Sequence, residues 1–205
     1  FHTFSFEEIK PMILFSGFAF VANLVQFLSY KMDLWFVNFY FFFKEMIGVY
    51  ALSVSLAQLV WMLPSAVHSV LFTFNSSAEY SLLEKYHKSK KTSNLILLYA
   101  IIAAIIGYFL SVYLVPIWFG LEFEDASKLI GILLFGIVPF CYGMGISAYF
   151  AGVGKVKYNM IGSIVGMIIC AIFDMILIPK YGIMGAAIAS VISYLSTVLV
   201  YFVLF

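Results

Sequence analysis

The stretch FDMILIPKYGIMGAAIAS, residues 173–190, contains the features from which the fold can be argued. An apolar run that carries one carboxylate, Asp174, ends at Pro179, and Gly182 then permits a tight turn into a second apolar run. Small residues open that second run, and small residues let two helix backbones approach closely in a membrane. We therefore expect two closely packed membrane helices joined by a short turn.

The composition of the whole chain is that of a membrane protein. Of its 205 residues, 64% are hydrophobic and 10% are charged, whereas a soluble domain has about 45–50% apolar and about 25% charged residues. The net charge is +1 and the sequence has no arginine, so no nucleic-acid partner is expected. Cys141 and Cys170 lie in apolar runs without metal-site spacing, so we expect no disulfide, no metal and no cofactor.

Long apolar runs predict an all-α integral membrane fold with six transmembrane helices in one domain, residues 1–205. The expected spans are at about 11–37, 46–75, 92–119, 128–152, 158–179 and 182–205, each near the length of about 20 residues that a bilayer requires. Pro64 and Pro139 should bend their spans, whereas Pro116 and Pro179 should terminate theirs. The chain begins at Phe1 and stops inside an apolar run, and we expect it to be part of a longer protein.

Lysines predict the orientation of the spans. They gather in the connections at 79–91 and 154–158, whereas the connection at 121–128 is acidic. Because lysine-rich loops stay in the cytoplasm, the first two connections and both ends of the segment are expected on the cytoplasmic side of the membrane.

Small residues are grouped on the last three spans, which predicts a compact bundle. Gly162 and Gly166 form a small-xxx-small pair in the fifth span. The fourth span carries Gly136, Gly143, Ser147 and Ala151, and the sixth carries Ala186, Ser190, Ser193 and Thr197.

A polar stripe runs along the first span. Its members fall within an arc of about 100° on an ideal helix: Ser16, Ala19, Asn23, Gln26, Tyr30 and Asp33. Such a stripe normally faces a bundle interior or a water-filled cavity. Lys31 lies about 160° from Asp33 and therefore off the stripe, at the rim of the cavity. The alternative is that Lys31 and Asp33 both lie at the outer interface.

Two further polar features remain open. The second span carries Gln58, Ser65, Ser69 and Ser76 on one face, with His68 at its edge. His68 is a candidate proton carrier, although a lone histidine in an apolar helix is more often structural. Asp174 lies about 24 Å into a core of about 30 Å, so we favour a position near the headgroups beside Lys180 over a coupling-ion site.

Three stretches carry a resemblance to a known family. They are IPKYGIMGAAIAS at 178–190, YKMDLWFVNFYFFFKEMIGVYALSVSLAQL at 30–59, and YFAGVGKVKYNMIGSIVG at 149–166. In this order they resemble the multidrug/oligosaccharidyl-lipid/polysaccharide flippase superfamily, and within it the C-terminal six-helix lobe of polysaccharide flippases of the O-antigen type.

The resemblance implies one lobe of a two-lobe flippase, with an N-terminal lobe as the partner of this chain. It implies a transporter, not an enzyme, that moves a lipid-linked oligosaccharide, an O-antigen (lipopolysaccharide) or capsule repeat unit, across the inner membrane by alternating access. Lys31 would meet the diphosphate of that substrate. The expected cavity residues are Asn23, Gln26, Tyr30, Lys31, Asp33 and Gln58, and the expected ion-coupling residues are Asp33, His68 and Asp174.

Other functions stay open at this point. A cation-coupled multidrug exporter of the same superfamily is the first alternative. A membrane-embedded enzyme would need catalytic groups at one depth, but His68 lies about 12 Å and Asp174 about 24 Å from the cytoplasmic side. A structural membrane protein that contacts only lipids and partners would not require the polar stripes.

Overall fold

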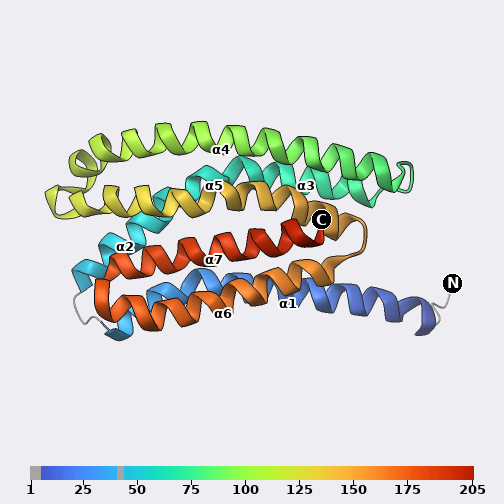
Figure 1. Cartoon of the computed structure of the whole chain (residues 1–205), viewed down its shortest axis with the longest axis horizontal. Coiled ribbons are helices and arrows are strands. Elements are labelled where there is room, and N and C mark those ends of the chain that lie inside the picture. The colour runs from blue at the N-terminus through green and yellow to red at the C-terminus, as the bar shows by residue number, and fades with distance from the viewer. Residues whose placement is uncertain (1–5, 41–43) are drawn as a thin grey trace, which may run out of the picture.

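The computed structural model describes residues 6–40 and 44–205, and all regular structure in these ranges is helical. Along the chain the helices are α1 (Phe6–Tyr40), α2 (Lys44–Ala57), η1 (Gln58–Trp61), α3 (Met62–Ser76), α4 (Leu82–Phe119), η2 (Leu121–Phe123), α5 (Glu124–Gly152), α6 (Val156–Tyr181) and α7 (Ile183–Leu204). The long helices run alongside one another and form a bundle (Figure 1).

In the described part of the chain, six helices are long and apolar enough to cross a membrane, which confirms the expected fold. The second of these spans, Glu45–Ser76, consists of α2, η1 and α3. The third begins earlier than its apolar run predicts, because Ser81 and Glu84 form a capping box that starts α4 at Leu82. At 38 residues, α4 is about 57 Å long and extends beyond a bilayer core of about 30 Å.

The prolines act differently from the expectation at two places. α4 continues past Pro116 to Phe119, and α6 continues past Pro179 to Tyr181. A proline in the last turn removes only one hydrogen bond, so the helices end instead at the following glycines, Gly120 (φ 95°) and Gly182 (φ 61°). α5 passes through Pro139 without interruption.

The small residues pack as expected. α7 lies against both α6 and α5, and α6 also lies against α1. Gly166 of α6 faces Ser193 and Thr197 of α7, and the Ser193 hydroxyl donates a hydrogen bond of 2.8 Å to the Gly166 carbonyl. A side chain at Gly166 would collide with Thr197, so glycine at this position is required for the close approach of α6 and α7.

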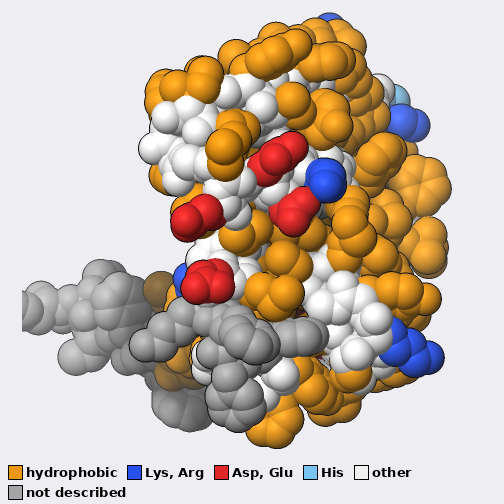
Figure 2. Space-filling model, turned by 90° about the vertical axis from the view of Figure 1, so that its left-hand side faces the viewer, with side chains coloured by type: hydrophobic (Ala, Val, Ile, Leu, Met, Phe, Trp, Pro, Cys, Tyr) orange, Lys and Arg blue, Asp and Glu red, His pale blue; other side chains and the backbone are white. Residues whose placement is uncertain are grey.

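The lysine-rich connections lie at one end of the bundle. The connections after α3 and α5, which border the lysine-rich segments, lie at the same end as both described chain ends (Figure 1). The opposite end carries the acidic connection between α4 and α5, and Figure 2 shows both acidic and basic side chains among hydrophobic ones on this face. The segments that were expected to share one side of the membrane therefore lie at one end of the molecule.

Candidate functional site

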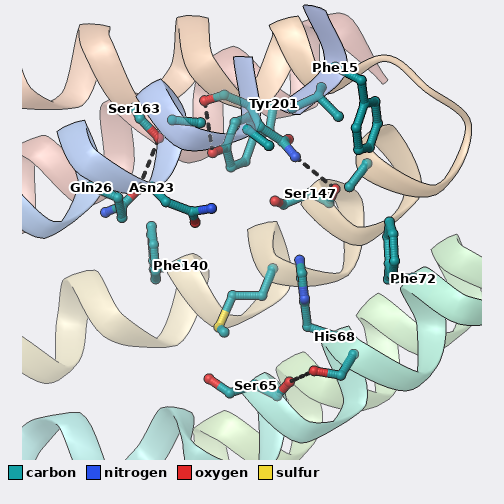
Figure 3. Close-up of a pocket in the computed structure, with 17 residues that line it drawn as sticks. Phe15, Asn23, Gln26, Ser65, His68, Phe72, Phe140, Ser147, Ser163 and Tyr201 are labelled. Carbon is teal, nitrogen blue, oxygen red and sulfur yellow. Dashed lines mark hydrogen bonds between the residues drawn. The ribbon is translucent and has the colours of Figure 1, made fainter. Parts of the chain in front are cut away.

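A cavity of about 540 Å³ lies between α1, α3, α5, α6 and α7. Figure 3 shows that its wall combines amide and hydroxyl side chains with aromatic rings. The polar residues that line it are Asn23, Gln26, Ser65, His68, Ser69, Ser147, Asn159, Ser163 and Tyr201. The rings of Phe15, Phe72 and Phe140 also face it.

Hydrogen bonds fix part of this wall. The Ser163 hydroxyl donates to Gln26 Oε1 at 3.1 Å and thereby joins α6 to α1 (Figure 3). Asn159 Nδ2 donates to the Ser147 carbonyl at 3.0 Å, which joins α6 to α5. Asn159 Oδ1 is buried and has no hydrogen-bond partner, although buried acceptors are normally satisfied.

When His68 is neutral, the wall of the cavity carries no formal charge. Among the described residues that line the cavity there is no aspartate, glutamate or lysine. Amides and hydroxyls both donate and accept hydrogen bonds, and aromatic rings offer flat apolar faces. The cavity is therefore suited to an uncharged molecule with many hydroxyl groups.

A second polar site is fully enclosed and lies where α1, α2, α6 and α7 meet. Asp33 accepts hydrogen bonds from Tyr50 Oη at 2.9 Å, from Cys170 Sγ at 3.0 Å and from the Ser190 hydroxyl. Cys170 Sγ also lies 3.6 Å from Asp174 Oδ2. We call these five residues the carboxylate cluster; all are at most 5% exposed.

Within the described residues, no lysine pairs with the carboxylate cluster. The one ion pair within the described ranges joins Lys128 to Asp125 at the molecular surface, so neither Asp33 nor Asp174 is neutralised by a lysine. Asp174 Oδ1 is buried without a hydrogen-bond partner. Ligand atoms of Asp33, Cys170 and Asp174 lie within 4.8 Å of one another. Two buried carboxylates this close are not stable as two bare anions, so the cluster has the properties of a cation or proton site.

The cavity and the carboxylate cluster form two successive layers of the same helices. Asp33 follows Gln26 by seven positions on α1, and Cys170 follows Ser163 by seven positions on α6. Both pairs of partners are hydrogen-bonded across the α1–α6 contact. Seven residues correspond to about two helical turns, so the layers lie about 10 Å apart along the bundle.

The site residues predicted from the sequence fall into three groups in the structure: those in the cavity wall, those in the carboxylate cluster, and those in neither. Asn23, Gln26 and His68 line the cavity, whereas Asp33 lies in the carboxylate cluster. Gln58 is in η1 and is not among the residues that line the cavity. A 3₁₀ turn advances about 120° per residue instead of about 100°, so η1 rotates Gln58 away from the face of Ser65 and Ser69. The side chain of Tyr30 lies outside the described residues.

The expectation that Asp174 lies beside Lys180 is wrong. Its side chain is 0% exposed and faces the carboxylate cluster, while Lys180 is exposed. Six positions on a helix correspond to about 120° around its axis, so Lys180 lies on another face. Lys31 is also exposed and does not line the cavity, because it lies about 160° from Asp33 on α1.

Sequence reasoning missed Tyr50, Ser190 and Cys170 as members of the cluster. Cys170 and Asp174 are spaced by four positions, which places them on one face of a helix and was a usable signal. Tyr50 and Ser190 gave no such signal, because their role depends on contacts between helices that are distant in the sequence.

Comparison with known proteins identifies the family of the chain. A family model described as "Polysaccharide biosynthesis protein" matches residues 2–128, which is more than half of the sequence. The matched range includes Asn23, Gln26, Asp33 and Tyr50, whereas Asp174 lies beyond it. No curated protein and no solved structure matches the chain.

Proposed function

Because the chain is a multi-pass membrane protein that belongs to the polysaccharide biosynthesis protein family, we propose that it forms one lobe of a flippase for lipid-linked oligosaccharides. The lobe would bind the sugar of an O-antigen or capsule repeat unit on one side of the bacterial inner membrane and release it on the other side. The cavity would open alternately to the two sides of the membrane, and this alternating access would carry the sugar across.

The observation that carries this proposal is the uncharged polar and aromatic wall of the cavity. Sugar hydroxyls pair well with amide groups such as those of Asn23, Gln26 and Asn159, and the apolar faces of sugar rings pack on aromatic side chains such as Phe140. The volume of about 540 Å³ lies within the range of small-molecule sites.

A multidrug exporter is the less favoured alternative. Binding of cationic drugs calls for acidic groups in the wall, and no described residue of the wall is acidic. The carboxylates are instead enclosed in a separate cluster with Tyr50 and Ser190. An enzyme is not proposed, because the hydroxyls of Ser69 and Ser163 in the described wall donate to the Ser65 carbonyl and to Gln26, and not to His68.

We assign ion coupling to the carboxylate cluster. Uptake of a cation or a proton between Asp33 and Asp174 would neutralise a pair that no lysine balances in the described ranges. His68 lines the cavity about one layer away and is a second candidate for proton transfer. Release of the bound ion on one side of the membrane would favour one open state of the transporter over the other.

A second lobe is proposed to complete the cavity. Asn23, Ser65 and Ser69 line the cavity and are exposed on this chain. Polar side chains within a span are unfavourable against lipid, which favours a water-filled space closed by another protein surface. We expect the end with the lysine-rich connections to face the cytoplasm.

The test compares two asparagines of α1 in the complete protein. Asn23 and Asn38 are both exposed on α1, but only Asn23 is among the residues that line the cavity. We expect Asn23→Ala combined with Gln26→Ala to reduce export of the lipid-linked oligosaccharide about tenfold or more, since each lost hydrogen bond contributes about 1 kcal/mol. Asn38→Ala should export normally. The measurement is the amount of lipid-linked sugar accessible on the outer face of the membrane, at equal protein levels. Equal export by both variants would contradict the proposal.

A further inference from the structure

The second membrane span is interrupted at its centre. α2 ends at Ala57, η1 covers Gln58–Trp61, and α3 begins at Met62. Trp61 has φ −91° and ψ 2°, which lies outside the helical region. Short 3₁₀ segments inside a helix often mark hinges. In Figure 1, α2 and α3 lie at different inclinations within the bundle.

Pro64 accounts for the position of the interruption. Proline has no N–H group, so it cannot donate to the carbonyl of Val60, and its ring conflicts with that carbonyl. Val60 is the third residue of η1. The sequence therefore places a permanent weak point between the two halves of this span.

The half before the weak point, α2, is bonded to the carboxylate cluster through Tyr50. Tyr50 of α2 is 0% exposed, and its hydroxyl donates to Asp33 Oδ2 at 2.9 Å and lies 3.3 Å from the Ser190 hydroxyl. Among the described residues of α2, Tyr50 is the one hydrogen-bonded to the carboxylates. The position of α2 relative to α1 and α7 therefore depends on the state of the cluster.

The half after the weak point forms a wall of the cavity. Ser65, His68, Ser69 and Phe72 of α3 line it. At the weak point itself, the Trp61 ring packs on Phe140 at 5.7 Å and on Tyr194 at 6.2 Å between ring centroids. Phe140 also lines the cavity, and Tyr194 follows Ser190 of the cluster by one turn of α7. Trp61 at the weak point therefore contacts one residue that lines the cavity, Phe140, and one residue that lies a helical turn from the cluster, Tyr194.

We propose that Tyr50 is a positioning residue that, through the 3₁₀ turn at Gln58–Trp61, transmits the charge state of the carboxylate cluster to the cavity wall formed by α3. Neutralisation of the cluster changes the strength of the hydrogen bond that the Tyr50 hydroxyl donates to Asp33. α2 then shifts, and the weak point converts this shift into a change in the inclination of α3. The inference rests on the coupling role proposed for the cluster and adds the path by which coupling reaches the cavity.

The test measures how accessible one residue of the cavity wall is while the charge of the carboxylate cluster is changed. In the complete protein, Ser69→Cys places a thiol on the exposed cavity face of α3, and the rate of its reaction with a water-soluble methanethiosulfonate is measured in membranes. Cys141 and Cys170 are at most 2% exposed and should not react. Asp174→Asn imitates the neutralised cluster without touching Tyr50.

We expect Asp174→Asn to change the rate at position 69 about fivefold or more, the lower end of ordinary coupling between sites. In a Tyr50→Phe background the same substitution should change it less than about twofold, because the hydroxyl that senses Asp33 is absent. Pro64→Ala should also suppress the response, because it restores the hydrogen bond to Val60 and removes the weak point.

Matched controls separate coupling from general damage. Tyr149→Phe removes a hydroxyl from a buried tyrosine of α5 outside the cluster, and Pro116→Ala removes a proline near the end of α4. Both should leave the response to Asp174→Asn intact. An unchanged response in Tyr50→Phe, or no response with Tyr50 present, would overturn the inference. If the response follows the expected pattern while no lipid-linked oligosaccharide is exported, the inference stands and the proposed substrate is wrong.

Discussion

Asp33 of α1 and Asp174 of α6 share a single thiol: Cys170 Sγ lies 3.0 Å from Asp33 Oδ1 and 3.6 Å from Asp174 Oδ2. The Cys170 thiol has one hydrogen, so it can donate to only one of these two oxygens at a time. Asp174 Oδ1 meanwhile has no hydrogen-bond partner among the described residues. The pair is therefore short of positive charge and of hydrogen-bond donors, and one bound cation or proton would supply what is missing.

Asp174→Asn should separate stability from transport. The substitution removes a buried carboxylate that no lysine balances in the described ranges, so the protein should be as stable as the wild type or more so. Export by the complete protein should fall about tenfold or more, because the cluster can no longer exchange an ion. Thermal unfolding of the purified protein and export at equal protein levels are the two measurements.

The control for this substitution is Asp125→Asn. Asp125 pairs with Lys128, but the side chains are 70% and 62% exposed. An exposed pair of this kind contributes little to stability, so both measurements should stay at wild-type values. Normal export by Asp174→Asn would remove the cluster from the transport cycle.

Gly166→Ala should destabilise the contact between α6 and α7. A β-carbon at Gly166 would collide with Thr197 Oγ1, so the Thr197 side chain or one of the helices must move. Overpacking of this kind costs about 1–3 kcal/mol. Gly107→Ala in α4 is the matched control, because no atom lies within 4 Å of its new β-carbon. Alanine there should be neutral or stabilising by about 1 kcal/mol. Thermal unfolding compares the two, and equal stability would show that α6 and α7 can separate at no cost.

The span count and the helix contacts could be predicted from the sequence because each depends on local composition. Apolar length determined the six spans, and the spacing of Gly162, Gly166 and the small residues of α7 indicated which faces meet. The cavity face of α1 was likewise readable, since Asn23 and Gln26 lie on one helical face and do line the cavity.

The carboxylate cluster could not be predicted in this way. Asp174 looked like an interfacial residue because depth was counted along one helix, and such a count contains nothing about what faces it. Only the packing of four helices brings Asp33, Tyr50 and Ser190 to its vicinity. The exclusion of Gln58 from the wall has a similar origin, because η1 changes the rotation of the helix between Gln58 and Ser65.

The orientation of the bundle has a direct test in variants that each carry one added cysteine. Lys88 lies at the lysine-rich end and Glu124 lies in the acidic connection at the other end. We expect Glu124→Cys to react with a membrane-impermeant thiol reagent in intact cells and Lys88→Cys to react only after the membrane is opened. Reaction at position 88 but not at 124 in intact cells would reverse the assignment. Cys141 and Cys170 are buried and give no background.

Lys31 provides the test of how the diphosphate of the proposed lipid-linked substrate is bound. Its side chain is exposed on α1 within a membrane span, which is unfavourable against lipid, so it should face water, a phosphate or another protein surface. It follows Gln26 by five positions, about 7.5 Å further along the helix and about 140° around it, so it can meet only a group that extends beyond the cavity wall. An ammonium group there would pair with the diphosphate while the sugar occupies the cavity.

Lys31→Ala should therefore reduce export about tenfold or more at a normal protein level, and Lys31→Arg should retain most of it because the positive charge is kept. Lys128→Ala is the control, since Lys128 is exposed and already pairs with Asp125. Export and protein level are measured together for all three variants. Normal export by Lys31→Ala would show that the diphosphate finds its cation elsewhere. Loss of the protein from the membrane would show instead that Lys31 stabilises a contact between lobes.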